Sequence, residues 1–481
     1  MSDKLINKVA KGVAWSTAEK LCSMLLQIVV SIVVARQLSP DDYRVMAILT
    51  FFTAVSLVVV DSGFSQTLLR KKETTSDDYN SVFIFNFVVS IVLYGLCVAI
   101  SPLLASYYDL AVITKIAPIL FLLLPLNALG IIQNTKLSRD FRFGVLSRIN
   151  FVASVVSGIA AIVVAVYGFG VWALVAQRVL VVAVKSLLLW WRGEWRINGS
   201  FKSQAWRNMA PFSFRLMSTD IVSTIYDNVA SLFMGRVYAS DLGYFSQAQK
   251  IKDLPIKSAV LSVQTVTYPA LAKIKDDVDR FAESFRKVLM VNTFVMAPVA
   301  VGLSAVAEPL FELMLGEKWL PTVPYFEVII LSGIFYPLAM VAYNVLKVHS
   351  NGSIIFRLEL LKKTIMTLIL AITIPQSPMA IACGLVAMTL VEFGVNFAAT
   401  RRYTTLSWWR MIRTILPSLI LTLVMYLAVD MVGYYAAMLS SAMLLLVQVV
   451  TGVVVYALGA WLCDFEALKE LVSVIKGMLK R

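Results

Sequence analysis

Histidine and cysteine are scarce in this sequence, and their scarcity excludes several kinds of chemistry. The single histidine, His349, has no pattern of partner residues that would support His-based hydrolysis. The four cysteines lie in or beside apolar segments, with neither metal-site spacing nor a disulfide framework: Cys22, Cys97, Cys383 and Cys463. No Gly-rich phosphate loop is present, which argues against direct use of ATP. The sequence therefore predicts no catalytic residue, no metal ion and no bound cofactor.

Acidic residues are outnumbered by basic ones. There are 29 Asp and Glu against 43 Lys and Arg, for a formal net charge of +14. Such a charge can indicate nucleic-acid binding, but here the cations occur in small groups at the ends of apolar runs and form no single basic patch. This pattern is typical of membrane topology, and we expect no nucleic-acid partner.

Long polar segments are also missing. The sequence is 59% hydrophobic with a mean hydropathy of +0.79, whereas soluble proteins are about 45–50% apolar. A membrane span takes about 20 apolar residues, so a chain of this length with short loops holds about twelve to fourteen helices. No room is left for a large soluble domain. The basic segment Met1 to Lys11 precedes an apolar stretch without a cleavage site, which predicts a retained first span.

Apolar windows bounded by Pro, Gly and charged residues predict an all-α integral membrane protein with about fourteen transmembrane helices. The predicted spans are roughly 12–35, 45–67, 81–105, 113–133, 148–168, 170–191, 210–235, 247–271, 287–307, 323–346, 355–374, 378–399, 411–430 and 436–462. The windows 12–35 and 247–271 are the least apolar.

Basic residues separate onto one side of these spans. That side has the basic groups of every second loop, among them Arg142, Arg148, Arg192, Lys362 and Lys363. The other side has about four: Arg36, Lys115, Arg236 and Lys318. Because a miscounted helix would invert half of the partition, it supports the number of spans and predicts that both termini are cytoplasmic.

Two helix corners about 200 residues apart share a pattern. Residues 33–47, VVARQLSPDDYRVMA, and 233–248, FMGRVYASDLGYFSQA, both have an Arg ending one helix, an Asp five positions later and a Tyr before the next helix. Chance similarity between apolar corners is the alternative to a duplication. The repeat predicts an N-lobe of six helices at 1–208, a C-lobe of six at 209–405, and two extra helices with a basic cytoplasmic tail at 406–481. Lobes with an even number of helices are related by a parallel pseudo-two-fold axis along the membrane normal, and they enclose a central cavity.

A small set of charged residues falls within the predicted spans, where each charge costs at least a few kcal/mol. Helices 1, 2, 7 and 8 are equivalent by the repeat and, with helix 6, hold most of this charge, so we expect them around the cavity. The cations suit an anionic cargo, best a phosphate group: Lys20, Arg178, Lys185, Arg215, Lys250 and Lys257. The carboxylates are candidates for coupling to H⁺ or Na⁺: Glu19, Asp61, Asp220, Asp227 and Asp253.

Each of these charges also has a purely structural interpretation. Interhelix ion pairs would join Glu19 to Lys20 or Arg178, and Asp253 to Lys250. Long basic side chains can also reach a membrane interface. Structural roles explain the whole set of charges less well, because neutral residues would pack between the helices at a lower cost in free energy.

The corner motifs match a known family. The run GVAWSTAEKLCSMLLQIVVSIVVARQLSPDDYRVMAI resembles the opening of Wzx-type polysaccharide flippases, in the branch of colanic acid and teichuronic acid exporters. These belong to the multidrug/oligosaccharidyl-lipid/polysaccharide exporter superfamily. The segments DNVASLFMGRVYASDLGYFSQAQKIKDLP and VTYPALAKIKDD resemble the family's second lobe. The resemblance covers nearly the whole chain, with one departure: Arg44 follows Tyr43 where the family usually has Gly.

The resemblance implies a transporter and not an enzyme. It implies export of undecaprenyl-diphosphate-linked oligosaccharide across the bacterial cytoplasmic membrane by alternating access, coupled to an ion gradient, for capsule, exopolysaccharide or O-antigen (lipopolysaccharide) biosynthesis. The expected partners are the lipid-linked oligosaccharide, membrane lipid and a polysaccharide polymerase.

Three alternatives stay open. A multidrug antiporter of the same superfamily would need an acidic cavity for cationic cargo, whereas the predicted cavity is basic. A peptidoglycan-precursor flippase suits the basic cavity, but the corner motifs favour the polysaccharide branch. A membrane glycosyltransferase or polymerase would show a substantial outer loop or an acidic active-site motif, and every predicted outer loop is short.

Overall fold

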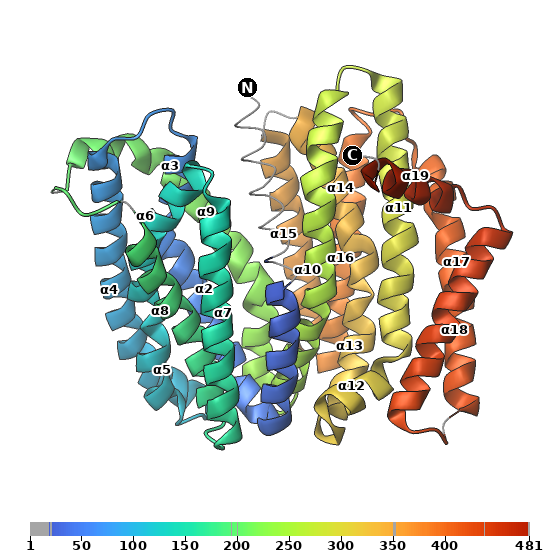
Figure 1. Ribbon diagram of the computed structural model, residues 1–481, viewed down its shortest axis with the longest axis horizontal. Helices are drawn as coiled ribbons and strands as arrows, with labels where there is room; N and C mark the ends of the chain where they lie inside the picture. The colour runs from blue at the N-terminus through green and yellow to red at the C-terminus, as the bar shows by residue number, and fades with distance from the viewer. Residues whose placement is uncertain are drawn as a thin grey trace. The chain divides into compact units, whose positions relative to one another are not determined.

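The computed structural model describes residues 19, 22–193, 195–199, 201–349, 353–436 and 438–479. Within these ranges the chain is helical apart from turns and short connecting segments, and it contains no strand. The chain divides into two compact units, Met1–Gly243 and Tyr244–Arg481, each a bundle of long helices (Figure 1). The predicted all-α fold class is therefore confirmed.

The first unit begins with a helix over Cys22–Gln37. It continues with α2 (Pro40–Asp61), α3 (Phe64–Arg70), α4 (Ser76–Tyr108), α5 (Ile113–Phe121), α6 (Leu123–Arg139), α7 (Phe143–Val166), α8 (Trp172–Arg192) and α9 (Ser203–Val237). α7 packs on α8, α6 contacts both α4 and α8, and α9 packs against α2. Capping boxes start two of these helices, because Ser39 and Thr75 each exchange hydrogen bonds with an Asp three residues later.

The second unit contains most of α10 (Asp241–Lys273) and all later helices. These are α11 (Val278–Ala305), α12 (Ala307–Leu315), the 3₁₀ helix η1 (Glu317–Thr322), α13 (Val323–Ile330), α14 (Ser332–His349), α15 (Ser353–Thr373), α16 (Pro378–Thr400), α17 (Trp408–Tyr435), α18 (Ser441–Leu462) and α19 (Glu466–Leu479). α14 packs on α16 and α11 on α17 around a core that includes Phe285, Phe397 and Leu338.

Ten helical segments of the described chain are long and apolar enough to cross a membrane. The described part of the first helix, Cys22–Gln37, is apolar but shorter. α9, α10 and α15 are long, at 35, 33 and 21 residues, but charged residues interrupt them. A multi-pass membrane protein is thus established, and the count of fourteen spans stays a prediction.

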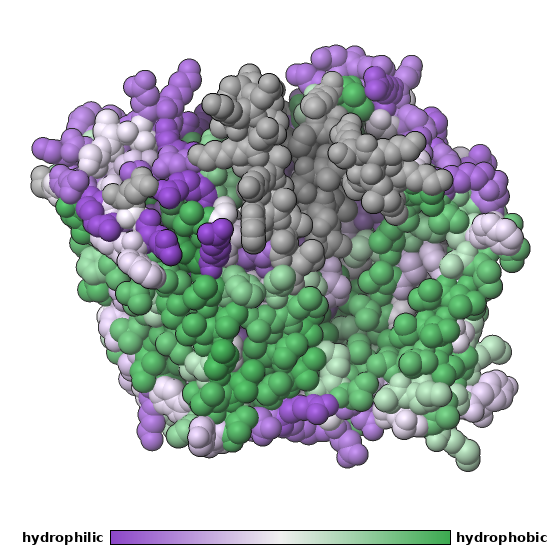
Figure 2. Space-filling view, viewed as in Figure 1, coloured by the Kyte–Doolittle hydropathy of each residue, from purple (hydrophilic) through white to green (hydrophobic). Residues whose placement is uncertain are grey.

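Large aliphatic side chains remain exposed along the middles of the helices. Leu96 on α4 is 51% exposed and Val453 on α18 is 64% exposed. Hydrophobic residues cover these middle regions, while hydrophilic residues gather at the helix ends (Figure 2). An apolar surface this extensive is unfavourable in water and is what a lipid-facing surface requires.

Three predicted spans are interrupted. The span predicted at 45–67 breaks where Ser62 and Gly63 adopt left-handed backbone angles, with φ of 48° and 72°. The span at 113–133 divides at Leu122 into α5 and α6, and that at 323–346 divides at Leu331 into α13 and α14. Hydropathy windows missed these breaks because they report the polarity of a segment and not its backbone dihedral angles.

The two similar helix corners meet in the first unit. A Cβ built on Gly243 would lie 2.1 Å from the carbonyl oxygen of Pro40, so only a glycine allows this approach. Arg44 donates a hydrogen bond to the carbonyl of Tyr108 at 3.0 Å, and Arg236 donates to that of Tyr107 at 2.7 Å. Both corners therefore bind the last carbonyls of α4. Arg44, the departure from the family pattern, occupies one of these capping positions.

The compact units divide at 243/244, whereas the predicted lobes divide at 208/209. The first boundary reflects the packing of the helices, and the second reflects the internal similarity of the sequence. α9 packs with the first unit through α2, α3 and α4. The predicted two-fold relation between the lobes stays a prediction.

Candidate functional site

Three basic residues of α8 share one face of the helix. Arg178, Lys185 and Arg192 follow one another at intervals of seven residues, or 700° of helical rotation, which returns each side chain to nearly the same direction. Arg178 and Arg192 are exposed at the surface of the unit and Lys185 is half-buried. At 1.5 Å per residue the row is about 21 Å long. It leads from the end of α8 at Arg192 well into its apolar middle, and we call it the α8 basic row.

The row is only partly neutralised. Glu19 of the first helix interacts electrostatically with Lys185 and accepts a hydrogen bond from Ser23 at 2.8 Å. Arg178 has neither a hydrogen bond nor an ion pair to another side chain within the described residues. A lone cation inside a membrane span costs about 2.5–3.5 kcal/mol on insertion scales, so its presence calls for water or an anionic ligand.

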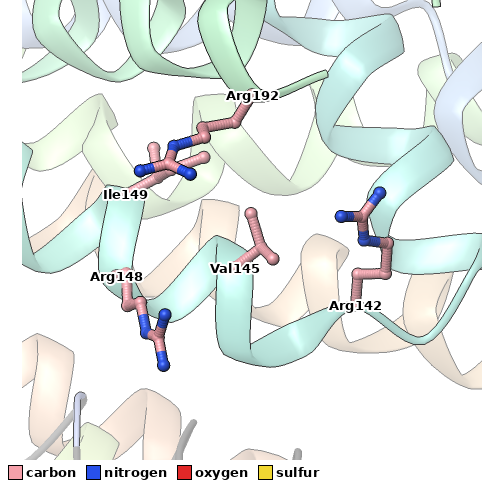
Figure 3. A pocket seen from close by; sticks show the side chains of 5 residues that line it. All are labelled: Arg142, Val145, Arg148, Ile149 and Arg192. Carbon is pink, nitrogen blue, oxygen red and sulfur yellow. The ribbon is translucent and has the colours of Figure 1, made fainter. Parts of the chain in front are cut away.

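A pocket lies at the end of the row. Arg192 from α8 lines it together with Arg142 and Arg148 from the start of α7, and Val145 and Ile149 supply its apolar wall. In Figure 3 the three guanidinium groups are spread around Val145, with Arg192 next to Ile149. We call this the arginine pocket. Sequence reasoning treated these arginines only as topological signals, because their convergence requires the packing of α7 on α8.

Asp61 lies at the break between α2 and α3. The Ser65 hydroxyl donates a hydrogen bond to its carboxylate, and Asp220 on α9 interacts with it electrostatically. Nearby, the hydroxyls of Thr67 and Ser213 are 2.7 Å apart. The structure therefore brings two predicted coupling carboxylates, Asp61 and Asp220, into one region of the first unit.

The predicted charges of α9 lie on its surface. Arg215, Asp220 and Asp227 are all exposed. Between them, Ser218 and Thr219 donate hydrogen bonds to the backbone carbonyls four residues earlier. Because these hydroxyls bind carbonyls of their own helix, the exposed surface of α9 here presents mainly its charged groups.

The charges of α10 belong to the second unit and form a local pair. Asp253 accepts from Lys257 at 2.6 Å and lies 3.5 Å from Lys252. The anticipated structural partner of Asp253 was Lys250, and the structure shows Lys257 in that role. Lys250 is half-buried on the same helix.

The predicted cavity residues are divided between the units. Glu19, Asp61, Arg178, Lys185 and the charges of α9 belong to the first unit, and those of α10 to the second. Lys20 lies outside the described residues. A single cavity lined by the whole set therefore remains a prediction.

A buried charge cluster in the second unit was not predicted. Lys362, which the charge partition counted among the loop cations, has a side chain only 4% exposed. Its ammonium lies 2.6 Å from Glu359 and 3.5 Å from Glu392. The signal available in the sequence was a Glu and a Lys three positions apart on the predicted span 355–374, with a lone Glu392 inside the next span.

Comparison with known proteins places the chain in a family. A family model described as polysaccharide biosynthesis protein matches residues 33–324. The teichuronic acid biosynthesis protein TuaB of Bacillus subtilis is 24% identical over 358 residues, covering 73% of this chain and 71% of the relative. The succinoglycan biosynthesis transport protein ExoT of Rhizobium meliloti is 24% identical over 482 residues, covering 98% of this chain and 97% of the relative.

Solved structures share the fold. The lipid II flippase MurJ, in an inward closed conformation, superposes with a TM-score of 0.76 at 16% identity, covering 95% of this chain and 99% of that one. An inward-facing multidrug resistance MATE family transporter of the MOP superfamily gives a TM-score of 0.62 at 15% identity, covering 82% of this chain and 95% of that one. The predicted resemblance is confirmed by the family model and by these relatives. Because the family model covers more than half of its length, the chain belongs to this family of polysaccharide biosynthesis proteins.

Proposed function

We propose that this protein moves undecaprenyl-diphosphate-linked oligosaccharide across the bacterial cytoplasmic membrane for the synthesis of a surface polysaccharide such as capsule, exopolysaccharide or O-antigen. Family membership and the names of the relatives, which include teichuronic acid, succinoglycan and lipopolysaccharide biosynthesis proteins, support the polysaccharide pathway. In this proposal both termini are cytoplasmic, and a chain polymerase receives the product on the other side.

The α8 basic row carries the proposal for a diphosphate cargo. Guanidinium and ammonium groups bind phosphate oxygens strongly, and Arg does so with two parallel hydrogen bonds. A diphosphate arriving at the arginine pocket would next meet Lys185 and then Arg178, each about 10 Å further along the helix. The lipid tail would remain in the membrane during this passage.

Glu19 gives the row a means of release. Its carboxylate interacts with Lys185, so an arriving phosphate competes with Glu19 and a departing one is replaced by it. An exchange of this kind avoids a lone ammonium within the apolar part of α8 at every stage.

Alternating access would move the cargo, and an ion gradient would drive it. The candidate coupling groups are the carboxylates Glu19, Asp61, Asp220, Asp227 and Asp253, of which Asp61 and Asp220 act on each other. Like charges that act on each other disfavour double ionisation, so this pair of carboxylates can gain a proton, which supports H⁺ as the coupling ion.

The experiment neutralises two positions of the row, Arg178→Gln with Lys185→Gln. We expect at least a tenfold loss of surface polysaccharide in cells lacking the chromosomal copy, with lipid-linked oligosaccharide accumulating inside and protein abundance unchanged. Arg401→Gln with Arg402→Gln removes the same charge from an exposed helix end and should retain export.

Three results separate the alternatives. If the double α8 variant exports normally, phosphate recognition by the row is wrong. If the purified protein binds lipophilic cations, and cells lacking the protein still export polysaccharide, the protein is a multidrug antiporter. Complementation of a strain lacking its peptidoglycan-precursor flippase would favour that cargo over oligosaccharide.

A further inference from the structure

Lys362 is a charged residue at the centre of a helix cluster. It lies nine residues after the start of α15 at Ser353, which is about 14 Å along the helix axis. Glu392 lies eight residues before the end of α16 at Thr400, or about 12 Å from that end. Both charges therefore lie well inside their helices, and snorkelling to a membrane interface does not account for a lysine that is only 4% exposed.

Two carboxylates flank the buried Lys362 ammonium, and they bind it unequally. Glu359 lies 2.6 Å from the Lys362 nitrogen and Glu392 lies 3.5 Å from it. Glu359 and Lys362 are therefore a close, mutually neutral pair, and the charge of Glu392 is only partly compensated. A carboxylate in this situation gains by binding a proton, because like charges at short range disfavour double ionisation.

Other titratable groups also lie around Glu392. From α15, Lys363 also acts on it electrostatically. From α14, Tyr343 faces the cluster with Lys362 5.6 Å and Lys347 4.6 Å from the centre of its ring. α13, which also packs on α16, carries Tyr325 and Glu327. Tyr325 packs on Phe245, and Glu327 interacts with Glu308.

Access and chemistry distinguish a proton from a metal ion. The side chains of Glu359 and Glu392 are 35% and 28% exposed, whereas Lys362 is enclosed, so both carboxylates have a route to the surface. The longer contact to Lys362 marks Glu392 as the exchangeable one. The Lys362 ammonium fills the place between the carboxylates where a sodium ion would bind. The cluster can thus change charge only by gaining or losing H⁺.

We propose that Glu392 is a proton-exchange site of the transport cycle, with Lys362 and Glu359 as its positioning residues. In one half-cycle the Glu392 carboxylate takes up one proton to become a carboxylic acid, leaving the Lys362–Glu359 pair neutral. In the other half-cycle it releases that proton, and its restored charge attracts Lys362, pulling α15 toward α16. The proposal rests on the proposed transport function for its role, but proton binding itself can be measured without cargo.

The alternative is a static ion cluster that only joins α14, α15 and α16. Two isosteric variants separate the readings. Glu392→Gln removes the exchanging group and leaves the neutral Lys362–Glu359 pair, so folding should be preserved. Glu359→Gln leaves Glu392 as the sole partner of Lys362, which should hold Glu392 ionised and move its proton uptake to lower pH.

The experiment is pH-difference infrared spectroscopy of the full-length protein in lipid, following the C=O stretch of protonated carboxyl groups. We expect a titrating band in the wild type that is absent in Glu392→Gln and shifted to lower pH in Glu359→Gln. Glu327→Gln, a control in a helix of the same unit, should leave this band in place. Polysaccharide export in cells should fall at least tenfold in Glu392→Gln at equal protein abundance.

Either of two results overturns the proposal: a Glu392→Gln protein whose carboxyl titration equals the wild type, or one that exports within twofold of it. If Glu392→Gln is poorly produced, an unchanged titration in Glu359→Gln overturns it equally. Failure of the cargo assignment is distinguishable, because Arg178→Gln with Lys185→Gln tests phosphate recognition and should leave the Glu392 band unchanged.

Discussion

Arg286 on α11 and Glu466 on α19 are joined by two hydrogen bonds, of which the bond from Nη1 to Oε2 is 3.1 Å long. The same guanidinium binds Glu283 on its own helix through Nε at 3.1 Å. One residue further on, the Lys287 ammonium lies 2.9 Å from Glu470. Ala467 packs into the apolar cluster of α11, α17 and α18. The C-terminal helix is thus attached to the second unit by ion pairs on one side and apolar contacts on the other.

We expect the attachment of α19 to depend on pH through Glu466. Its hydrogen bonds to Arg286 lower the pKa of this carboxyl below its ordinary value. Because the lowered pKa belongs to the attached state, the contribution is complete above the ordinary glutamate pKa of about 4.3 and is lost as pH falls through the lowered value. The protection of the α19 amides from hydrogen exchange, relative to the intrinsic exchange rate at each pH, should be high at neutral pH and fall in acid.

Glu466→Gln should quicken exchange of α19 at neutral pH by a few-fold, since exposed ion pairs contribute at most about 1 kcal/mol. Asp464→Asn provides the control, because Asp464 in the turn before α19 pairs with Lys469 of that helix, and among the described residues it makes no ion pair to α11. Equal exchange in both variants would show that apolar packing alone holds the helix.

Gly63→Ala should destabilise the first unit. Gly63 has a φ of 72°, and a Cβ there would lie 2.6 Å from the Ser213 carbonyl oxygen and 3.0 Å from the Leu216 Cβ. The left-handed backbone alone costs an alanine about 1–2 kcal/mol, and the clash must also push α9 away from the α2–α3 break. A lower melting temperature in detergent is expected.

Gly95→Ala is the matched control for Gly63. Gly95 lies within α4 and has no atom within 4 Å of an added Cβ, so alanine should be neutral or stabilise the helix by up to about 1 kcal/mol. Similar melting temperatures for the two variants would contradict the packing of α9 on the break.

Neutralising Lys250 and Lys257 together should abolish export while leaving abundance normal. Lys257 is 71% exposed and pairs with Asp253, so replacing it with Gln leaves Lys252 as a partner for that carboxylate and should not unfold the helix. Surface polysaccharide and membrane abundance are measured side by side, with Arg401→Gln and Arg402→Gln as the charge-matched control. Unchanged export would remove both lysines from the cargo route.

The α8 basic row shows how far sequence reasoning reaches within one helix. The seven-residue spacing of Arg178 and Lys185 follows from the sequence and from helix geometry alone. Extending the row to the arginine pocket requires α7, because Arg142 and Arg148 approach Arg192 only when α7 packs on α8. A one-dimensional pattern does not specify which helix a given face contacts.

Ion pairing shows a second limit. Asp253 can reach Lys250 at three positions or Lys257 at four, and both lie on the same face of α10. The side-chain rotamer selects Lys257. Lys362 was counted among the basic residues of one membrane side although the predicted span 355–374 contains it, and α15 buries its side chain.

Hydropathy and charge placement establish a helical, multi-pass membrane protein, because the free energy of placing a residue in lipid or water is local and adds up along the chain. The corner motifs are local as well, and they identify the family. The approach of α9 to the break at Gly63, and the choice of partners for Glu392, Arg192 and Arg286, depend on side chains that meet from distant segments. Those contacts exist only after the helices pack, since each arises from a rotamer and a dihedral angle that neighbouring helices select.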